Sequence, residues 1–296
     1  YGDWKLKWKY DEGGAPELLV KGLGLPVGYL ESDLTKEVFE NGYFKTGDII
    51  DEELNYISRK KDIIKSRGYL VSPYEIEECI KLGYDEFHFY DDLFNIKAKK
   101  IHDFCDELEK RNLEVTWDFR GRVNAVTRES LEHAKKTGLR QISFGVETGS
   151  DEGLKFLRKG SKTEKYRDAF RWTRELGIKT VADFIIGFPF EKTPEDIRKN
   201  IDYVIKLDPD YLLLGVLMLL PGTEIYDQGI AAGQADPDKW RQFSLNPTSG
   251  FSYDYWTEHM SSEQLMELKV KHYRRFYLRP KYILRTVLSV TGWMRG

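Results

Sequence analysis

Hydrophobic and polar residues alternate regularly through most of the chain after about residue 85, and less regularly before it. Short apolar runs typical of buried strands are separated by stretches in which apolar residues recur every three or four positions. The apolar runs predict strands at 86–90, 115–119, 141–146, 180–186 and 211–217, and the stretches between them predict helices at 96–110, 128–137, 152–157, 163–176 and 194–207. Strand–helix–strand spacing implies parallel pairs with right-handed crossovers. The pattern predicts an α/β fold: an incomplete parallel (β/α) barrel of about five βα units.

A small β-rich segment is expected before this barrel. Repeated glycines and a proline at 22–28 indicate loops and tight turns. Short strands are predicted at 17–20, 44–50 and 56–58, and a helical turn or two at Leu34–Glu40. Asn41-Gly42 is a strong hairpin signal. The stretch PYEIEECIKLG predicts one helix that joins the two parts and ends at Gly83. We expect three parts, at 1–78, 79–235 and 236–296.

The composition is that of an ordinary globular chain. Of its 296 residues 41% are hydrophobic and 32% charged, with a net charge of -3. The absence of a basic excess argues against nucleic acid as a partner. No apolar run approaches the ~20 residues of a membrane span, and the N-terminus does not resemble a signal peptide. The start at Tyr1 rather than Met favours an excerpt of a longer protein. We expect a cytoplasmic location and a small-molecule substrate that the sequence does not specify.

Polar residues follow the predicted strands where each strand ends. Asp91 and Asp92 follow the first strand, Arg122 the second, Glu147 the third and Gly187 the fourth. Taken singly, each has a local explanation, such as a helix cap, a surface charge or a local ion pair. Because the carboxyl ends of parallel strands meet at one edge, together they predict a site for a polar ligand.

The same stretches resemble the radical S-adenosylmethionine enzymes, in particular the group that often carries a cobalamin-binding domain. The resemblance rests on EFHFYDDLF, WDFRGRVNAVTRESLEHAKKTGLRQISFGVETGSDEGLKFLRKG, TVADFIIGFPFEKTPEDIRKNIDYVIKLDPDY and LPGTEIYD. It implies S-adenosylmethionine, a [4Fe–4S] cluster and cobalamin as cofactors of the parent family.

The resemblance also implies contacts with S-adenosylmethionine. Asp91 or Asp92 would lie near its amino group, Arg122 near its carboxylate and Glu147 near its ribose or methionine part. Gly187 would bring backbone close to the adenine, in a turn that Phe190 crowds because the family usually has glycine there.

The cysteines depart from this family. Its cluster is held by a CxxxCxxC loop, whereas this chain has only Cys79 and Cys105, each on a predicted helix. Two cysteines also make neither a disulfide framework nor a tetrahedral metal site. We therefore predict buried structural thiols, no metal ligands and no catalytic residue, and a fragment that is inactive as it stands.

The N-terminal part resembles a different family. GYLESDLTKEVFENGYFKTGDIIDEELNYISRKKDIIKSRGYLVSPYEIEE is similar to the hinge region of adenylate-forming acyl-CoA synthetases. This resemblance implies that Asp48 and Arg59 contact the ribose of ATP, that Lys61 is the hinge and that Gly68 lies beside a pantetheine channel. The alternatives to a radical enzyme fragment are thus a fragment of an ATP-dependent ligase, or a non-catalytic fusion or assembly chimera.

Overall fold

The chain divides into two compact units. The computed structural model describes residues 5–9, 17–21, 38–50, 56–59, 64–66, 69–71, 73–90, 94–95 and 97–293. One unit comprises Tyr1–Arg120 and Glu132–Arg140, and the other Gly121–Leu131 and Gln141–Gly296. None of the helices in these described ranges is long and apolar enough to cross a membrane.

The first unit begins with a small antiparallel sheet. Its strands lie in the order β1 (Lys5–Lys9), β2 (Glu17–Lys21), β4 (Tyr43–Ile50) and β3 (Phe39–Glu40). Strand β5 (Tyr56–Arg59) pairs with β4. The predicted hairpin is confirmed, because Asn41 and Gly42 have φ of 52° and 77° between β3 and β4. The predicted helix at Leu34–Glu40 is wrong for its last two residues, although Val38 before them is helical. Phe39 and Glu40 pair with Phe44 and Tyr43 as strand β3. Strands β6 (Ile64–Ser66) and β7 (Tyr69–Val71) form a separate hairpin.

The rest of this unit contains the first parallel strands. Helix α2 (Pro73–Lys81) ends before Gly83, whose φ is 91°, as the sequence predicted. Strand β8 (Glu86–Phe89) pairs in parallel with β9 (Thr116–Gly121), and α3 (Ala98–Lys110) and α4 (Arg128–Lys136) follow them along the chain. A core of interlocking rings holds α3 on this sheet, formed by Phe89, Phe94, Phe104, Trp117 and Phe119.

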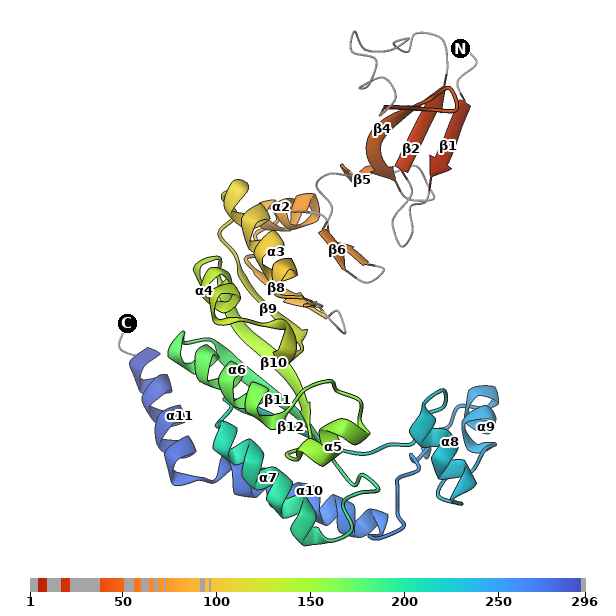
Figure 1. Ribbon diagram of the computed structural model, residues 1–296, viewed down its shortest axis with the longest axis vertical. Coiled ribbons are helices and arrows are strands. Elements are labelled where there is room, and N and C mark those ends of the chain that lie inside the picture. The colour runs from red at the N-terminus through yellow and green to blue at the C-terminus, as the bar shows by residue number, and fades with distance from the viewer. Residues whose placement is uncertain are drawn as a thin grey trace. The chain divides into compact units, whose positions relative to one another are not determined.

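The second unit has the same strand–helix alternation. Strands β10 (Leu139–Glu147), β11 (Lys179–Ile186) and β12 (Tyr211–Val216) are parallel neighbours. Between them lie α5 (Asp151–Phe156), α6 (Thr163–Glu175) and α7 (Pro194–Leu207) (Figure 1). The sheet order is β12-β11-β10-β9-β8, which confirms the predicted five-stranded parallel sheet. A short 3-10 helix, η2 (Val123–Ala125), also belongs to this unit.

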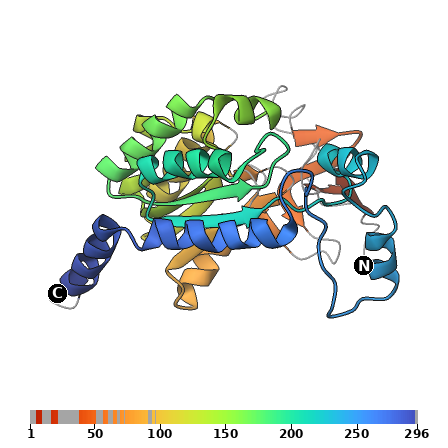
Figure 2. The same cartoon turned by 90° about the horizontal axis from the view of Figure 1, so that it is seen from below.

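Helix α10 (Ser262–Tyr277) runs along β12 (Figure 2). The hydroxyls of Tyr273 and Tyr277 accept hydrogen bonds from the backbone N–H groups of Leu214 and Leu212, at 2.8 and 2.9 Å. The helix thus satisfies backbone donors that an edge strand would otherwise expose. The remaining helices of the unit are α8 (Glu224–Ala231), α9 (Lys239–Leu245) and α11 (Pro280–Trp293).

Candidate functional site

A cavity of about 480 Å³ opens at the carboxyl ends of β10, β11 and β12. Its volume lies in the range of small-molecule and cofactor sites. The walls combine apolar side chains with a few charged ones: Glu147, Phe156, Leu157, Arg158, Lys159, Ile185, Phe188, Leu217, Glu224, Ile225 and Gln228. The cavity lies within the second unit, at the strand ends where the sequence predicted a polar-ligand site.

Glu147 ends β10 and forms the polar side of this cavity. Its Oε1 accepts a hydrogen bond from the Lys159 ammonium at 2.8 Å, and the two side chains are only 20% and 24% exposed. Glu147 has a left-handed φ of 62°, and the register of β10 shifts between Gly145 and Glu147. Strained backbone of this kind concentrates at functional sites. The shift turns the carboxylate toward the loop after α5, where Lys159 meets it.

Gly145 makes room for this ion pair. A Cβ at position 145 would lie 2.8 Å from Glu147 Oε1 and 3.4 Å from Lys159 Nζ. Tyr166 closes the far side, donating from its hydroxyl to the Gly145 carbonyl at 3.4 Å. Burial raises the pKa of Tyr166 to about 12, with a smaller contribution from the Glu147 charge. The hydroxyl therefore stays protonated and remains a donor at neutral pH.

The turn after β11 is held by a buried carboxylate. Glu191 is 1% exposed, and its Oε2 accepts from the N–H groups of Gly187 and Phe188 at 2.7 and 3.1 Å. Asn200 donates to the other oxygen at 2.6 Å. Burial raises the pKa of Glu191, and these three donors oppose that rise. Gly187 has φ 86°, a conformation that glycine adopts without strain.

Phe190 stacks in this turn rather than disrupting it. Its ring lies 5.1 Å from that of Phe188, nearly parallel, and the two cover one wall of the apolar cluster around Leu217. Gly153 provides the space, because a Cβ there would lie 2.9 Å from the Phe190 ring. The crowding that the sequence predicted is thus relieved by glycine on α5.

The other predicted ligand contacts fall in different places. Arg122 is exposed, next to η2, and its positive charge lowers the pKa of Tyr166, so it acts on the same hydroxyl as Glu147. Asp91 and Asp92 lie outside the described residues, as do Lys61 and Gly68.

The predicted ATP-ribose residues are neighbours in the N-terminal sheet. Asp48 on β4 and Arg59 on β5 are directly paired across the two antiparallel strands. The sequence motifs therefore predicted two positions that the fold brings side by side.

Two functional candidates escaped the sequence reasoning. Lys159 lies 12 residues after Glu147 along the chain, beyond α5. The hydrophobic pattern of the sequence gives no sign that these two side chains form a pair. Glu191 carried a weak signal, since it closes the GFPFE segment that contains Gly187.

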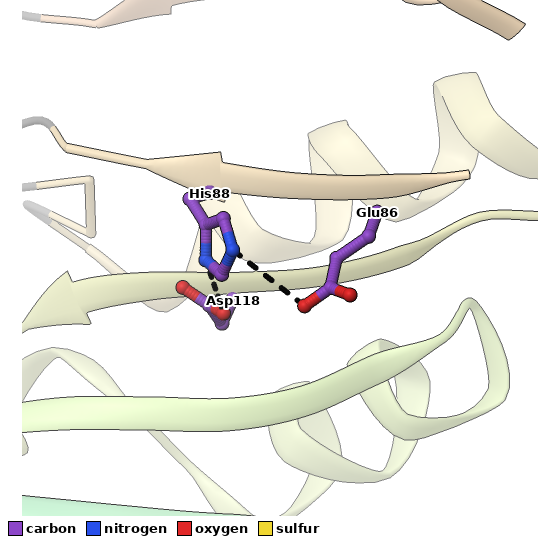
Figure 3. Close-up of side chains that lie close together, drawn as sticks. All are labelled: Glu86, His88 and Asp118. Atoms are coloured by element: carbon purple, nitrogen blue, oxygen red, sulfur yellow. Dashed lines mark ion pairs between the residues drawn. The ribbon is translucent and has the colours of Figure 1, made fainter. Parts of the chain in front are cut away.

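A second polar cluster lies on the face of β8 and β9 opposite their aromatic core (Figure 3). His88 Nδ1 is 2.7 Å from Asp118 Oδ2, directly across the strands, and His88 Nε2 is 3.5 Å from Glu86. Arg140 bonds to both Glu86 and Asp118. The Arg140 guanidinium therefore already balances the negative charge of the Glu86 and Asp118 carboxylates.

Comparison with known proteins identifies the family. The Radical SAM superfamily matches residues 61–216, more than half of the chain. The chain therefore belongs to the radical SAM superfamily. It is 30% identical to an uncharacterized methyltransferase of Pyrococcus horikoshii, over 74% of this chain and 47% of that protein.

Two further likenesses are local or structural. A 2-succinylbenzoate–CoA ligase of Staphylococcus aureus is 47% identical over 85 residues, which are 27% of this chain and 17% of the ligase. The radical S-adenosylmethionine methyltransferase TsrM from Kitasatospora setae, solved with cobalamin and a [4Fe–4S] cluster bound, is 23% identical. That structure aligns with a TM-score of 0.48 over 55% of this chain and 34% of its own. The chain spans less than half the length of the two curated relatives.

Proposed function

We propose that the cavity at the ends of β10, β11 and β12 binds the methionine part of S-adenosylmethionine. The observation that carries this proposal is the Glu147–Lys159 ion pair, partly buried at the cavity wall. A carboxylate beside an ammonium is complementary to the two charged groups of an amino acid. Lys159 would pair with the ligand carboxylate, and Glu147 would accept hydrogen bonds from its ammonium group.

The apolar wall suits the rest of the ligand. Ile185, Phe188 and Leu217 offer a surface on which adenine would pack, and the Gly187 turn supplies backbone beside it. Arg122 would add a second cation for the ligand carboxylate, and the assignment of Asp91 or Asp92 to the ligand ammonium stays a prediction from the sequence. These roles follow from the resemblance to the family, and substitution of each residue tests them one by one.

The [4Fe–4S] cluster of this superfamily does not fit the two cysteines of the chain. Cys105 is fully buried on α3, accepts a hydrogen bond from the Thr137 hydroxyl at 3.2 Å, and has its pKa raised to about 12 by burial. Cluster ligands are thiolates, and three are needed. Cys79 lies on α2 and completes the count of two. We therefore infer that these 296 residues do not cleave S-adenosylmethionine reductively by themselves.

Two titrations test this proposal. Calorimetry with iron-free protein should show S-adenosylmethionine binding that Glu147→Gln and Lys159→Gln each weaken by about ten- to a hundredfold, the effect of losing a charged hydrogen bond. Arg158→Gln is the matched control, because Arg158 lines the same cavity but pairs with the exposed Glu224. Anaerobic reconstitution with iron and sulfide should leave well under one cluster per chain. A stable, stoichiometric cluster would overturn the inference on activity.

An adenylating role for the N-terminal part is the second candidate. The specific observation is that Asp48 and Arg59 are paired positions on β4 and β5, in a chain of which 85 residues are 47% identical to the ligase. A carboxylate can accept hydrogen bonds from both ribose hydroxyls. ATP binding that Asp48→Asn abolishes would support this role. Binding of neither nucleotide nor S-adenosylmethionine by a cooperatively folded chain would favour a non-catalytic fusion instead.

A further inference from the structure

Four side chains of types that can ligate metals lie close together on α3 and α4. His102, Asp106 and Glu109 follow one another at intervals of four and three residues on α3, so they lie on one face of the helix. His133 on α4 projects onto the same face. All four residues belong to the first unit.

The distances suit a small divalent cation. His133 Nε2 lies 3.3 Å from Glu109 Oε2 and 3.9 Å from Asp106 Oδ1, and the three ligand atoms lie within 4.8 Å of one another. A tetrahedral ion with bonds of about 2.1 Å places its ligand atoms about 3.4 Å apart. A small rotation of the exposed Asp106 side chain would complete that geometry.

His102 sets the orientation of the His133 ring. The Nδ1 atoms of the two rings are 3.0 Å apart, so they share one hydrogen bond. When His133 donates through Nδ1, its Nε2 keeps a lone pair directed at the two carboxylates. Metal-bound histidines usually donate their second ring nitrogen to a fixed partner in this way.

The charge balance favours a metal here over the Glu86–His88–Asp118 cluster. In that cluster, whose Glu86, His88 and Asp118 side chains are drawn in Figure 3, Arg140 already bonds to both carboxylates. In the described part of the chain, by contrast, His133 is the only basic side chain within 4.0 Å of the Asp106 and Glu109 carboxylates, and it carries a charge only when it is protonated. Their side chains are 66% and 54% exposed, which leaves a path for the ion and room for a water ligand.

We propose that His133, Asp106 and Glu109 form a binding site for a divalent transition-metal ion of the Zn²⁺ class, with His102 as a positioning residue. One imidazole nitrogen and two carboxylate oxygens, with a fourth position open, form a donor set that Zn²⁺ accepts. Because the ligands come from two helices, the bound ion ties α3 to α4 and stabilises the folded state by mass action.

Titration of Zn²⁺ into chelator-treated protein tests the proposal. We expect one ion per chain, a melting temperature that rises with Zn²⁺ concentration, and loss of both effects in His133→Gln and in the Asp106→Asn/Glu109→Gln double variant. The carboxylates are exposed, so the double variant keeps its fold. His88→Gln is the matched control and should bind Zn²⁺ as the parent chain does. The absence of saturable Zn²⁺ binding, or binding that His133→Gln leaves unchanged, would overturn the proposal.

His102 needs its own readout. His102→Phe should weaken Zn²⁺ binding about 10- to 100-fold, the usual cost of losing an outer partner of a metal ligand, without lowering the melting temperature of the metal-free protein. His102→Asn, which retains a hydrogen-bonding side chain, should recover part of the affinity. Equal affinities in the two variants would remove His102 from the site.

Discussion

His272 is expected to make the second unit sensitive to acid. It lies on the inner face of α10, is 1% exposed, and neither ring nitrogen has a hydrogen-bond partner within the described residues. Its pKa is lowered to about 4, mainly by burial and also by the charges of Arg275, Lys271 and Arg198, while Asp202 on α7 acts in the opposite direction. The folded protein therefore holds this imidazole neutral.

The sign and size of the effect follow from linkage. Between pH 6.5 and about 4 the unfolded chain binds a proton at this position and the folded chain does not. The free energy of unfolding therefore falls by about 1.4 kcal/mol for each pH unit of acidification in this window, or about 3 kcal/mol in all. Above pH 6.5 both states are neutral, and the group contributes no pH dependence.

Urea denaturation at pH 5, 6, 7 and 8 with a His272→Leu variant tests this reasoning. Leucine fills a similar volume and does not titrate, so the free energies of unfolding of variant and parent should diverge by about 2 kcal/mol between pH 7 and pH 5. His272→Gln is the control for burial of a polar group: its absolute stability will differ, but its divergence from the parent must be the same. Parallel pH profiles for parent and variants would refute the assignment of a depressed pKa to His272.

Three further substitutions have defined outcomes. Gly145→Ala should weaken S-adenosylmethionine binding about tenfold or more, because the added Cβ would lie 2.8 Å from Glu147 Oε1 and displace that carboxylate. Calorimetry measures the affinity, and an unchanged circular dichroism spectrum shows that the fold is kept. Unchanged affinity would show that ligand binding does not depend on the Glu147–Lys159 geometry. Glu191→Gln should lower the free energy of unfolding, measured in urea, by about 1–3 kcal/mol. The side-chain nitrogen that replaces one carboxylate oxygen is itself a donor and would face one of the three buried groups that now donate to Glu191. Equal stability of variant and parent would contradict the role of this carboxylate. Gly138→Ala should lower the free energy of unfolding by about 1–3 kcal/mol more than Gly83→Ala does. Both glycines have φ above 90°, but only at position 138 would a Cβ meet backbone, at 1.8 Å from the Val115 carbonyl oxygen. Equal losses of stability in the two variants would rule out that clash.

The parallel sheet could be predicted because its signal is local. Each of strands β8 to β12 carries a short apolar run, and each helix between them has apolar residues along one face. The order of apolar and polar residues was therefore enough to predict the alternating strands and helices. The segment Phe39–Glu40 was predicted as the end of a helix of one or two turns that Ser32 or Asp33 would cap. Pairing with Tyr43–Phe44 across the Asn41-Gly42 turn, with the rings of Phe39 and Phe44 5.5 Å apart, makes it a strand.

The candidate site was predictable only where it follows strand ends. Glu147 and Gly187 end or follow strands that the pattern identified. Lys159 contacts Glu147 because the register of β10 shifts before Glu147 and because Glu147 has a left-handed backbone conformation. Neither feature can be predicted from hydrophobic periodicity. The His102–His133 contact joins residues 31 positions apart, which only tertiary packing of α3 on α4 creates.

A charge swap at the cavity tests the central claim most directly. Glu147→Lys/Lys159→Glu preserves an ion pair at the cavity wall but reverses the order of its charges, so a purely structural role for the pair would leave ligand binding untouched. Calorimetric titration of S-adenosylmethionine into the iron-free parent and swapped chains separates the two roles. Saturable binding to the parent and none to the swapped chain is the result that the proposed site predicts. Equal binding to both, or no binding to the parent, would contradict it.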